Sequence, residues 1–184
     1  DDQPELLFLN QDMRKVKSLK LDFIPEKFNA VFAESVPDGI LICYQVKEEK
    51  RKKVYAAKLT ANYTLSAPIL VMDLEDATIQ DMDDAMMVSS ANKQYHLVYA
   101  SGLHEGSVVI KASVIDADLH LKNNISQVIS ADKSWVVSSK ACVSNKGDAV
   151  MLLSSKPSSK GASEELKILM SHISQTQLGV YPVA

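Results

Sequence analysis

The chain has 184 residues, of which 46% are hydrophobic, and its 20 basic and 23 acidic side chains give a formal net charge of −3. This composition is typical of a folded domain and excludes an intrinsically disordered chain, which would hold fewer apolar and more charged residues. With six glycines in the whole chain, the composition also excludes collagen.

Short segments rich in Val, Ile, Leu, Tyr and Ser follow one another along the chain, bounded by polar turn residues, and predict β-strands. Two strands come first, at residues 6–9 and 15–23. A group of four strands then occurs three times. In each group the first two strands are joined by a polar turn, and a polar loop leads to the third strand, which is followed by the fourth. The paired strands fall at 29–44, 84–99 and 140–153, the third strands at 54–59, 109–114 and 168–173, and the fourth at 67–72, 126–130 and 179–183.

The spacing of these groups is nearly constant, since Tyr44 and Tyr99 are 55 residues apart and Asn92 and Asn145 are 53 apart. A unit of about 50 residues with four antiparallel strands resembles the blade of a β-propeller. The resemblance covers nearly the whole chain and rests on this pattern, because no WD dipeptide and no kelch Gly-Gly pair is present. It implies one all-β, propeller-like domain over residues 1–184, with a β-sandwich as the alternative. The units are a half unit at 1–23 and three repeats at about 24–76, 77–131 and 132–184.

Closure of such a ring is a difficulty, because propellers typically have about four to eight blades and three and a half leave sheet edges open. Three solutions are open. The chain is part of a larger propeller, or two copies form a homodimer that closes a seven-bladed ring, or the repeats fold as a β-sandwich.

The strand order predicts where a binding site would lie. In a four-stranded meander the loops between second and third strands fall at the same end as the connections between units. Long loops of varied composition on a rigid scaffold are the usual location of binding residues. We therefore predict that this end of the strands, called the loop edge below, holds the binding site. We expect a protein or glycan partner there. The candidate binding residues are Lys50, Arg51, Lys52, Lys53, Asp81, Asp83, His104 and Glu105.

Two charged segments of the loop edge have simpler interpretations as well. Residues 47–53 hold five cations and two anions, which would suit an anionic partner, although such runs are usually solvated surface. Residues 73–84 supply carboxylates suited to Ca²⁺ but lack the Gly and the regular spacing of a dedicated loop. We therefore predict no metal site and no cofactor.

No catalytic residue is predicted, because the chain has no His-Glu-x-x-His pattern, no Gly-x-Ser-x-Gly elbow and no Gly-rich phosphate loop. These observations favour a non-catalytic interaction module on a β-repeat scaffold. One alternative is part of a propeller-type glycan-active enzyme, which would need two carboxylates about 5–10 Å apart, supplied by residues 73–84. The other alternative is a structural or adhesive β-sandwich.

Composition also bears on partners and compartment. We predict no nucleic-acid partner, because neutralising phosphates needs clustered Lys and Arg. We predict no transmembrane segment, because no run of 18 apolar residues is present. The missing first Met and the Ser- and Val-rich strands favour export to the periplasm or the cell exterior. Two cysteines are too few for a disulfide framework, so Cys43 is predicted as a small buried hydrophobe, with a Cys43–Cys142 bridge as the alternative.

Overall fold

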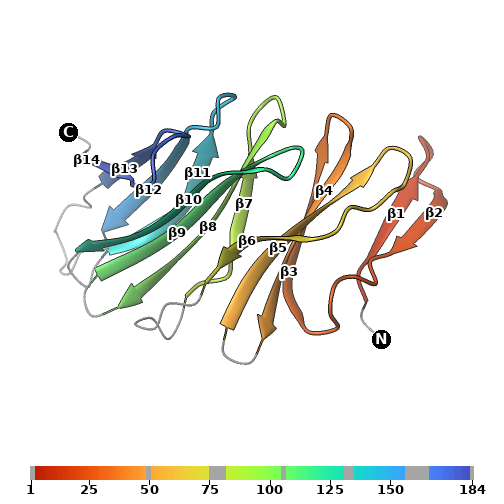
Figure 1. Cartoon of the computed structure of the whole chain (residues 1–184), viewed down its shortest axis with the longest axis horizontal. Helices are drawn as coiled ribbons and strands as arrows, with labels where there is room; N and C mark the ends of the chain where they lie inside the picture. The colour runs from red at the N-terminus through yellow and green to blue at the C-terminus, as the bar shows by residue number, and fades with distance from the viewer. Residues whose placement is uncertain are drawn as a thin grey trace.

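The computed structural model describes residues 3–48, 51–74, 82–104, 107–130, 135–155 and 166–182, which form β-strands and turns and contain no helix (Figure 1). The all-β prediction is confirmed, and every predicted strand overlaps an observed one. Three sheets have four strands each, and one has two. The hairpin is β1 (Glu5–Leu9) with β2 (Lys15–Lys20). The first sheet is β3 (Phe28–Val36), β4 (Gly39–Glu48), β5 (Arg51–Thr60) and β6 (Ile69–Asp73). The second is β7 (Met86–Ser89), β8 (Tyr95–His104), β9 (Ser107–Asp116) and β10 (Leu121–Ser130). The third is β11 (Trp135–Val143), β12 (Ala149–Ser155), β13 (Leu166–Ser171) and β14 (Gly179–Pro182).

Each four-stranded sheet is an antiparallel meander, in which every strand pairs with the next one along the chain. Two-sided burial explains the apolar runs of the central strands. In β4, Leu41 and Cys43 pack toward the second sheet, whereas Ile42 and Tyr44 pack toward the hairpin. A strand buried on both faces reads as continuous apolar sequence rather than as an alternating pattern.

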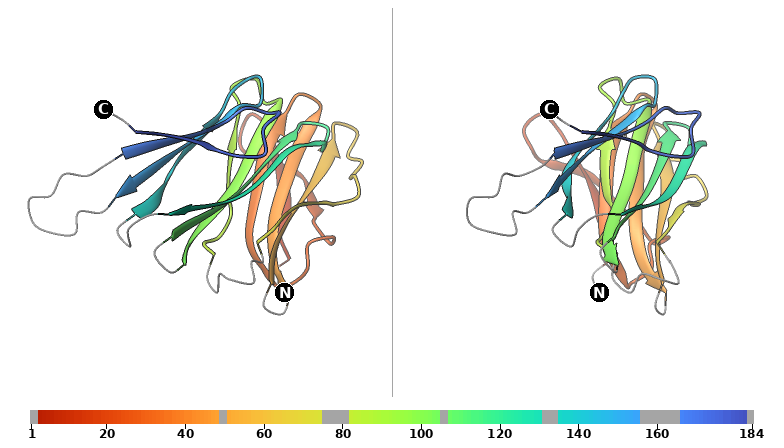
Figure 2. Two further views of the ribbon diagram at one scale, coloured as in Figure 1. Left: turned by 60° about the vertical axis from the view of Figure 1, so that its left-hand side comes forward. Right: turned by 90° about the vertical axis from the view of Figure 1, so that its left-hand side faces the viewer.

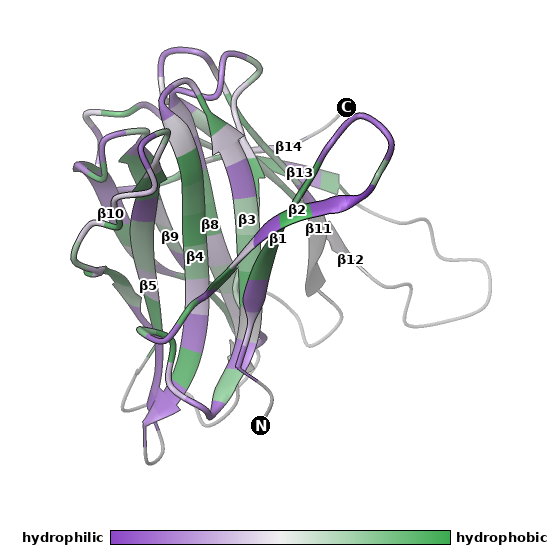
Figure 3. Ribbon diagram, turned by 90° about the vertical axis from the view of Figure 1, so that its right-hand side faces the viewer, coloured by the Kyte–Doolittle hydropathy of each residue, from purple (hydrophilic) through white to green (hydrophobic). Residues whose placement is uncertain are grey.

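The sheets stand in a row, with the hairpin at one end and the β11–β14 sheet at the other (Figure 1 and the left view of Figure 2). Three hydrophobic cores separate them: hairpin from first sheet, first sheet from second, and second from third. In Figure 3 the hairpin lies in front of the first sheet, and β4 changes from apolar to polar toward its lower end. The described residues form an open row of sheets rather than a closed ring.

One local design recurs in the turns along the upper side of Figure 1. A residue with a polar side chain begins each turn, and its carbonyl accepts a hydrogen bond from the amide three residues later. That later residue has a positive φ in all five turns, although Gly occupies the position in one of them only. The pairs of first and fourth residues are Asn10 and Met13, Thr60 and Tyr63, Ser90 and Lys93, Asp116 and Leu119, and Ser144 and Gly147.

Replacing Met13 by glycine is expected to stabilise the protein by about 0.5–1 kcal/mol, because a left-handed backbone strains a residue with a Cβ. Met13 has φ 59° and an exposed side chain, so little packing is lost. Urea unfolding measures the gain. Met13→Ala removes the same side chain but keeps the Cβ, so equal stability of the two variants would contradict the explanation.

His96 is a buried histidine between the first two sheets. Its Nδ1 lies 2.9 Å from Ser89 Oγ, and its Nε2 is buried without a hydrogen-bond partner among the described residues. Burial lowers the pKa of His96, and this effect outweighs the opposing attraction of Glu34 and Asp116, while the charge of Lys93 lowers the pKa further. The imidazole is therefore held in its neutral form.

This histidine predicts an acid-sensitive stability. Histidine in an unfolded chain titrates near pH 6.5, so below about that pH the unfolded state binds the extra proton while His96 in the folded state still resists it. The stability contributed by neutral His96 is present above that pH and is lost as the pH falls. We expect the free energy of unfolding to decrease from about pH 7 to about pH 5, and His96→Gln to remove most of that decrease.

Gln177→Leu, which replaces an exposed side chain that does not titrate, provides the control and should keep the slope. Asp116 does not interfere in this window: burial alone would raise its pKa, but hydrogen bonds from Lys122 and His120 hold the pKa at about 2. A slope that survives His96→Gln would contradict the assignment.

Both cysteines are free thiols, with Cys43 buried and Cys142 exposed, so the predicted role of Cys43 is confirmed and no bridge joins the two. Among the described residues, no helix is long and apolar enough to cross a membrane.

Candidate functional site

Part of the predicted loop-edge site can be placed. Lys50, Asp81 and Glu105 lie outside the described residues. Arg51, Lys52 and Lys53 begin β5, Asp83 precedes β7, and His104 ends β8. The ends of β4 and β8 and the starts of β5 and β9 lie along the lower side of the row in Figure 1.

Lys52 forms a bridge between the first and second sheets. Its Nζ lies 2.9 Å from Asp84 Oδ1 and donates a hydrogen bond of 2.8 Å to the carbonyl of Met82. Gln45 Nε2 donates to the same carboxylate at 2.8 Å. The hydrogen bond from Lys52 is the main reason that the pKa of Asp84 lies below its usual value. The cation at this position therefore already has an intramolecular partner.

Two other predicted residues are also engaged within the chain. The amide of Asp83 donates to the carbonyl of Ser101 at 2.8 Å, and Ser101 Oγ lies 3.3 Å from Asp83 Oδ2. Lys53 Nζ lies 2.6 Å from Glu48 Oε2, a contact that raises the pKa of Lys53. The loop edge thus brings Lys52 to the segment that holds Asp83, whereas Lys53 pairs with Glu48, and these contacts hold strands and sheets together.

A buried polar seam continues this network between the two sheets. Gln45 is fully buried, and its Oε1 accepts a hydrogen bond of 2.8 Å from the amide of Ala85. Ser113 Oγ donates to the carbonyl of Val71, and Lys111 Nζ donates to the carbonyl of Asp73. No pattern in the sequence signals these contacts, because their partners are 38 to 42 residues apart.

Metal-binding chemistry receives no support from this part of the chain. Among the described residues, no group of three His, Cys, Asp or Glu side chains is placed to hold an ion.

The outward side of the β11–β14 sheet is the largest feature that sequence reasoning missed. Its strands place apolar side chains opposite one another, as in the pairs Val150 with Met170 and Leu152 with Ile168. None of the three described cores contains these side chains, and Met170 and Tyr181 on the same side are 40% and 53% exposed. This outer face consists of Cys142, Val150, Leu152, Ile168, Met170 and Tyr181.

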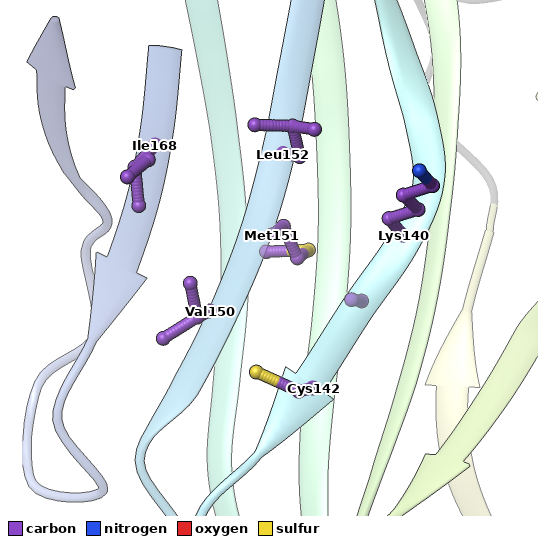
Figure 4. A pocket seen from close by; sticks show the side chains of 7 residues that line it. Lys140, Cys142, Val150, Met151, Leu152 and Ile168 are labelled. Carbon is purple, nitrogen blue, oxygen red and sulfur yellow. The ribbon is translucent and has the colours of Figure 1, made fainter. Parts of the chain in front are cut away.

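A shallow hollow of about 340 Å³ lies on the outer face. Figure 4 shows Cys142, Val150 and Ile168 around it on three neighbouring strands, β11, β12 and β13, with Lys140 at the side. The lining is almost entirely apolar, so the hollow suits a hydrophobic contact rather than acid–base chemistry.

The outer face occupies the same position in its sheet as two faces that are covered. In every four-stranded sheet, a row of side chains runs from the second strand to the third and fourth through directly paired positions. In the first and second sheets this row faces the following sheet, and the members on the second and third strands are buried in a core. In the third sheet it is open. The rows are Cys43, Ala56 and Ile69; Tyr99, Ala112 and Ile125; and Leu152, Ile168 and Tyr181.

The opposite end of the row of sheets also presents apolar side chains. Leu6, Phe8 and Leu19 pack on the first sheet, and the other side of the hairpin exposes Leu7 and Leu9. Val16 on β2 is exposed as well. We call Leu7, Leu9 and Val16 the hairpin end.

Comparison of the chain with protein-family models, with curated proteins and with solved structures yields no match.

Proposed function

We propose that the chain is a non-catalytic interaction module and that it binds a protein partner by packing an apolar β-sheet surface on the outer face. The observation that carries the proposal is the row of Leu152, Ile168 and Tyr181, whose counterparts in the other two sheets are covered by a following sheet. Contiguous exposed apolar surface on a folded protein typically marks an interaction site.

The outer face is a better candidate than the loop edge for a physical reason. Burying apolar side chains is favourable by about 25 cal/mol for each Å² removed from water. Lys52 and Asp84, by contrast, would have to give up their mutual contact or be desolvated together, which costs energy. The loop edge keeps a secondary role in this proposal, as a rim of charged groups that sets the orientation of the partner.

We also propose that the scaffold is propeller-like rather than a β-sandwich. Its support is the face-to-face order of three sheets with the same meander, each packed on the next. The glycan-active alternative draws its carboxylates from residues 73–84, of which 75–81 lie outside the described residues, and Asp84 is bound to Lys52 and Gln45. The interaction module therefore remains the stronger candidate.

Photo-crosslinking from Cys142 tests the function. Cys142 is exposed on the outer face, whereas burial raises the pKa of Cys43 to about 12, so a benzophenone maleimide should label Cys142 alone. Illumination in an extract of cells that make the protein should yield a crosslinked protein, with the crosslink mapped to the outer face by mass spectrometry.

Two variants decide what the crosslink means. Met170→Glu puts a charge on the outer face and should abolish it. Val128→Glu changes a side chain that is 61% exposed on the second sheet and should leave it intact. A crosslink that survives Met170→Glu but is lost in Arg51→Glu would assign binding to the loop edge, and a wild-type yield equal to that of Met170→Glu would overturn the proposal.

A further inference from the structure

We propose that a second copy of this chain covers the outer face, with the hairpin end of each copy packed on the outer face of the other. This inference rests on the proposed function and names its partner. Inside the chain, the row of paired side chains on the second, third and fourth strands of the first and second sheets packs on the sheet that follows. The proposed contact repeats this arrangement, with the hairpin of the other copy in the position of the following sheet. The hairpin and the β11–β14 sheet stand at the two ends of the row, and no other described element covers the outward side of either.

The hairpin already covers a four-stranded sheet within the chain. On its inner side, Leu6, Phe8 and Leu19 pack against the first sheet, in one core with the buried Ile42 and Tyr44. The two strands, together with Leu21 and Ile24 of the segment that follows them, cover the central strands of the first sheet. In the proposed contact the hairpin would do the same on both of its sides, with the first sheet of its own copy on one side and the β11–β14 sheet of the other copy on the opposite side.

The two surfaces have matching chemistry. The hairpin end offers Leu7, Leu9 and Val16, and the outer face offers Val150, Leu152, Ile168, Met170 and Tyr181 around a shallow apolar hollow. Face-to-face packing of β-sheets about 10 Å apart uses side chains of this kind, with branched aliphatic residues interdigitating. Charged side chains stand beside both sets: Glu5 and Lys20 are paired on the hairpin side that exposes Leu7, with Lys15 Nζ 3.7 Å from Glu5 Oε1, and Lys140 lines the hollow.

The direction of the contact limits how copies can assemble, and we propose the smallest closed assembly, a pair. A contact between two different surfaces either closes into a ring or continues as a filament. A pair of copies related by a two-fold axis makes the contact twice and leaves neither end open. Doubling the contact also matters for stability, because one hairpin covers little surface and stable interfaces bury at least about 1,200 Å² in total.

Light scattering after gel filtration over a range of concentrations tests the pairing. We expect a discrete species of twice the chain mass. Leu7→Glu at the hairpin end and Met170→Glu on the outer face should each convert it to a monomer, while Val128→Glu should leave it unchanged. Leu7 is 54% exposed and Val128 61%, so the control replaces a side chain of similar exposure. Circular dichroism confirms that each variant is folded.

Mixing the two defective variants separates a head-to-tail contact from a symmetric one. Leu7→Glu keeps an intact outer face and Met170→Glu keeps an intact hairpin end, so an equimolar mixture regains one of the two contacts. It should form pairs at concentrations at which each variant alone is a monomer, although at higher concentrations than the unmodified protein needs. If Leu7→Glu pairs normally while Met170→Glu does not, the outer faces meet each other and the head-to-tail proposal is overturned.

The unmodified protein supplies an independent measurement. The rate at which the Cys142 thiol reacts with a disulfide reagent should fall as the concentration rises through the dimerisation range, while buried Cys43 stays unreactive. A monomer at every concentration with a reactive Cys142 overturns the pairing and leaves the outer face to another protein. A monomer with an unreactive Cys142 means that the chain itself covers this face, and overturns the proposed function as well.

Discussion

Replacing Gly39 by alanine is expected to lower the free energy of unfolding by about 3–5 kcal/mol, because the added side chain meets both backbone strain and a steric clash. Gly39 follows the tight turn between β3 and β4 with φ 153°, a conformation that L-residues with a side chain rarely adopt. A Cβ at this position would lie 2.0 Å from the carbonyl oxygen of Leu59. Because that oxygen belongs to the backbone of β5, relief of the clash requires moving a central strand.

Gly147→Ala provides the comparison for this prediction. Gly147 also has a positive φ, 87°, but the nearest atom to an added Cβ is the side-chain Cδ1 of Ile173, at 2.4 Å. A side-chain end can rotate away, so the expected loss is about 1–2 kcal/mol. Urea unfolding of both variants measures the difference. If Gly39→Ala lowers the free energy of unfolding no more than Gly147→Ala does, β5 can move away from the clash at little cost and the explanation is wrong.

Gln45→Leu is expected to destabilise the fold by about 2–4 kcal/mol, because it leaves two polar groups without their partner. The buried amide of Ala85 loses its acceptor, and the carboxylate of Asp84 loses one of its donors. Leucine fills nearly the same volume, so the loss reports hydrogen bonding rather than a cavity. Chemical denaturation of the purified variant measures it directly.

A related glutamine extends the test to the next interface. Gln127 on β10 accepts a hydrogen bond of 2.6 Å from the amide of Leu178 and donates one of 3.2 Å to its carbonyl. Gln127→Leu should therefore cost a similar amount, whereas the exposed Gln177→Leu should change stability by less than about 0.5 kcal/mol. Equal effects of Gln45→Leu and Gln177→Leu would mean that the polar seam contributes nothing to the attachment of the sheets.

The strands were predictable from the sequence because their signal is local. Apolar segments such as residues 54–59 and 107–112 are bounded by polar turns, and the connections are short enough for consecutive strands to pair. The sequence also led to the correct interpretation of Cys43. It could not distinguish Cys43 from Cys142 by pattern alone, since both lie in similar apolar strands and differ only in what covers them.

The site was harder to predict for a related reason. Lys52 and Asp83 stand out in the sequence as charged residues in loops, but whether a charge is free depends on contacts with residues far along the chain. The outer face reads as ordinary core: Val150, Leu152 and Ile168 look like the buried residues of the other sheets. A pattern of hydrophobicity shows that a surface is suited to burial and does not show whether anything covers it.

The arrangement in a row has a consequence for how the molecule opens. Each core joins one sheet to the next, so the first and second sheets are held on both sides, whereas the hairpin and the third sheet are each held on one, and the second sheet has a four-stranded sheet on either side. In such quasi-one-dimensional architectures the ends fray before the centre. Amide hydrogen exchange should therefore be slowest in β8 and β9 and fastest in β1, β2 and β14. A partner bound at either end would therefore first slow the amide hydrogen exchange of the terminal strands, before it changed the shape of the molecule.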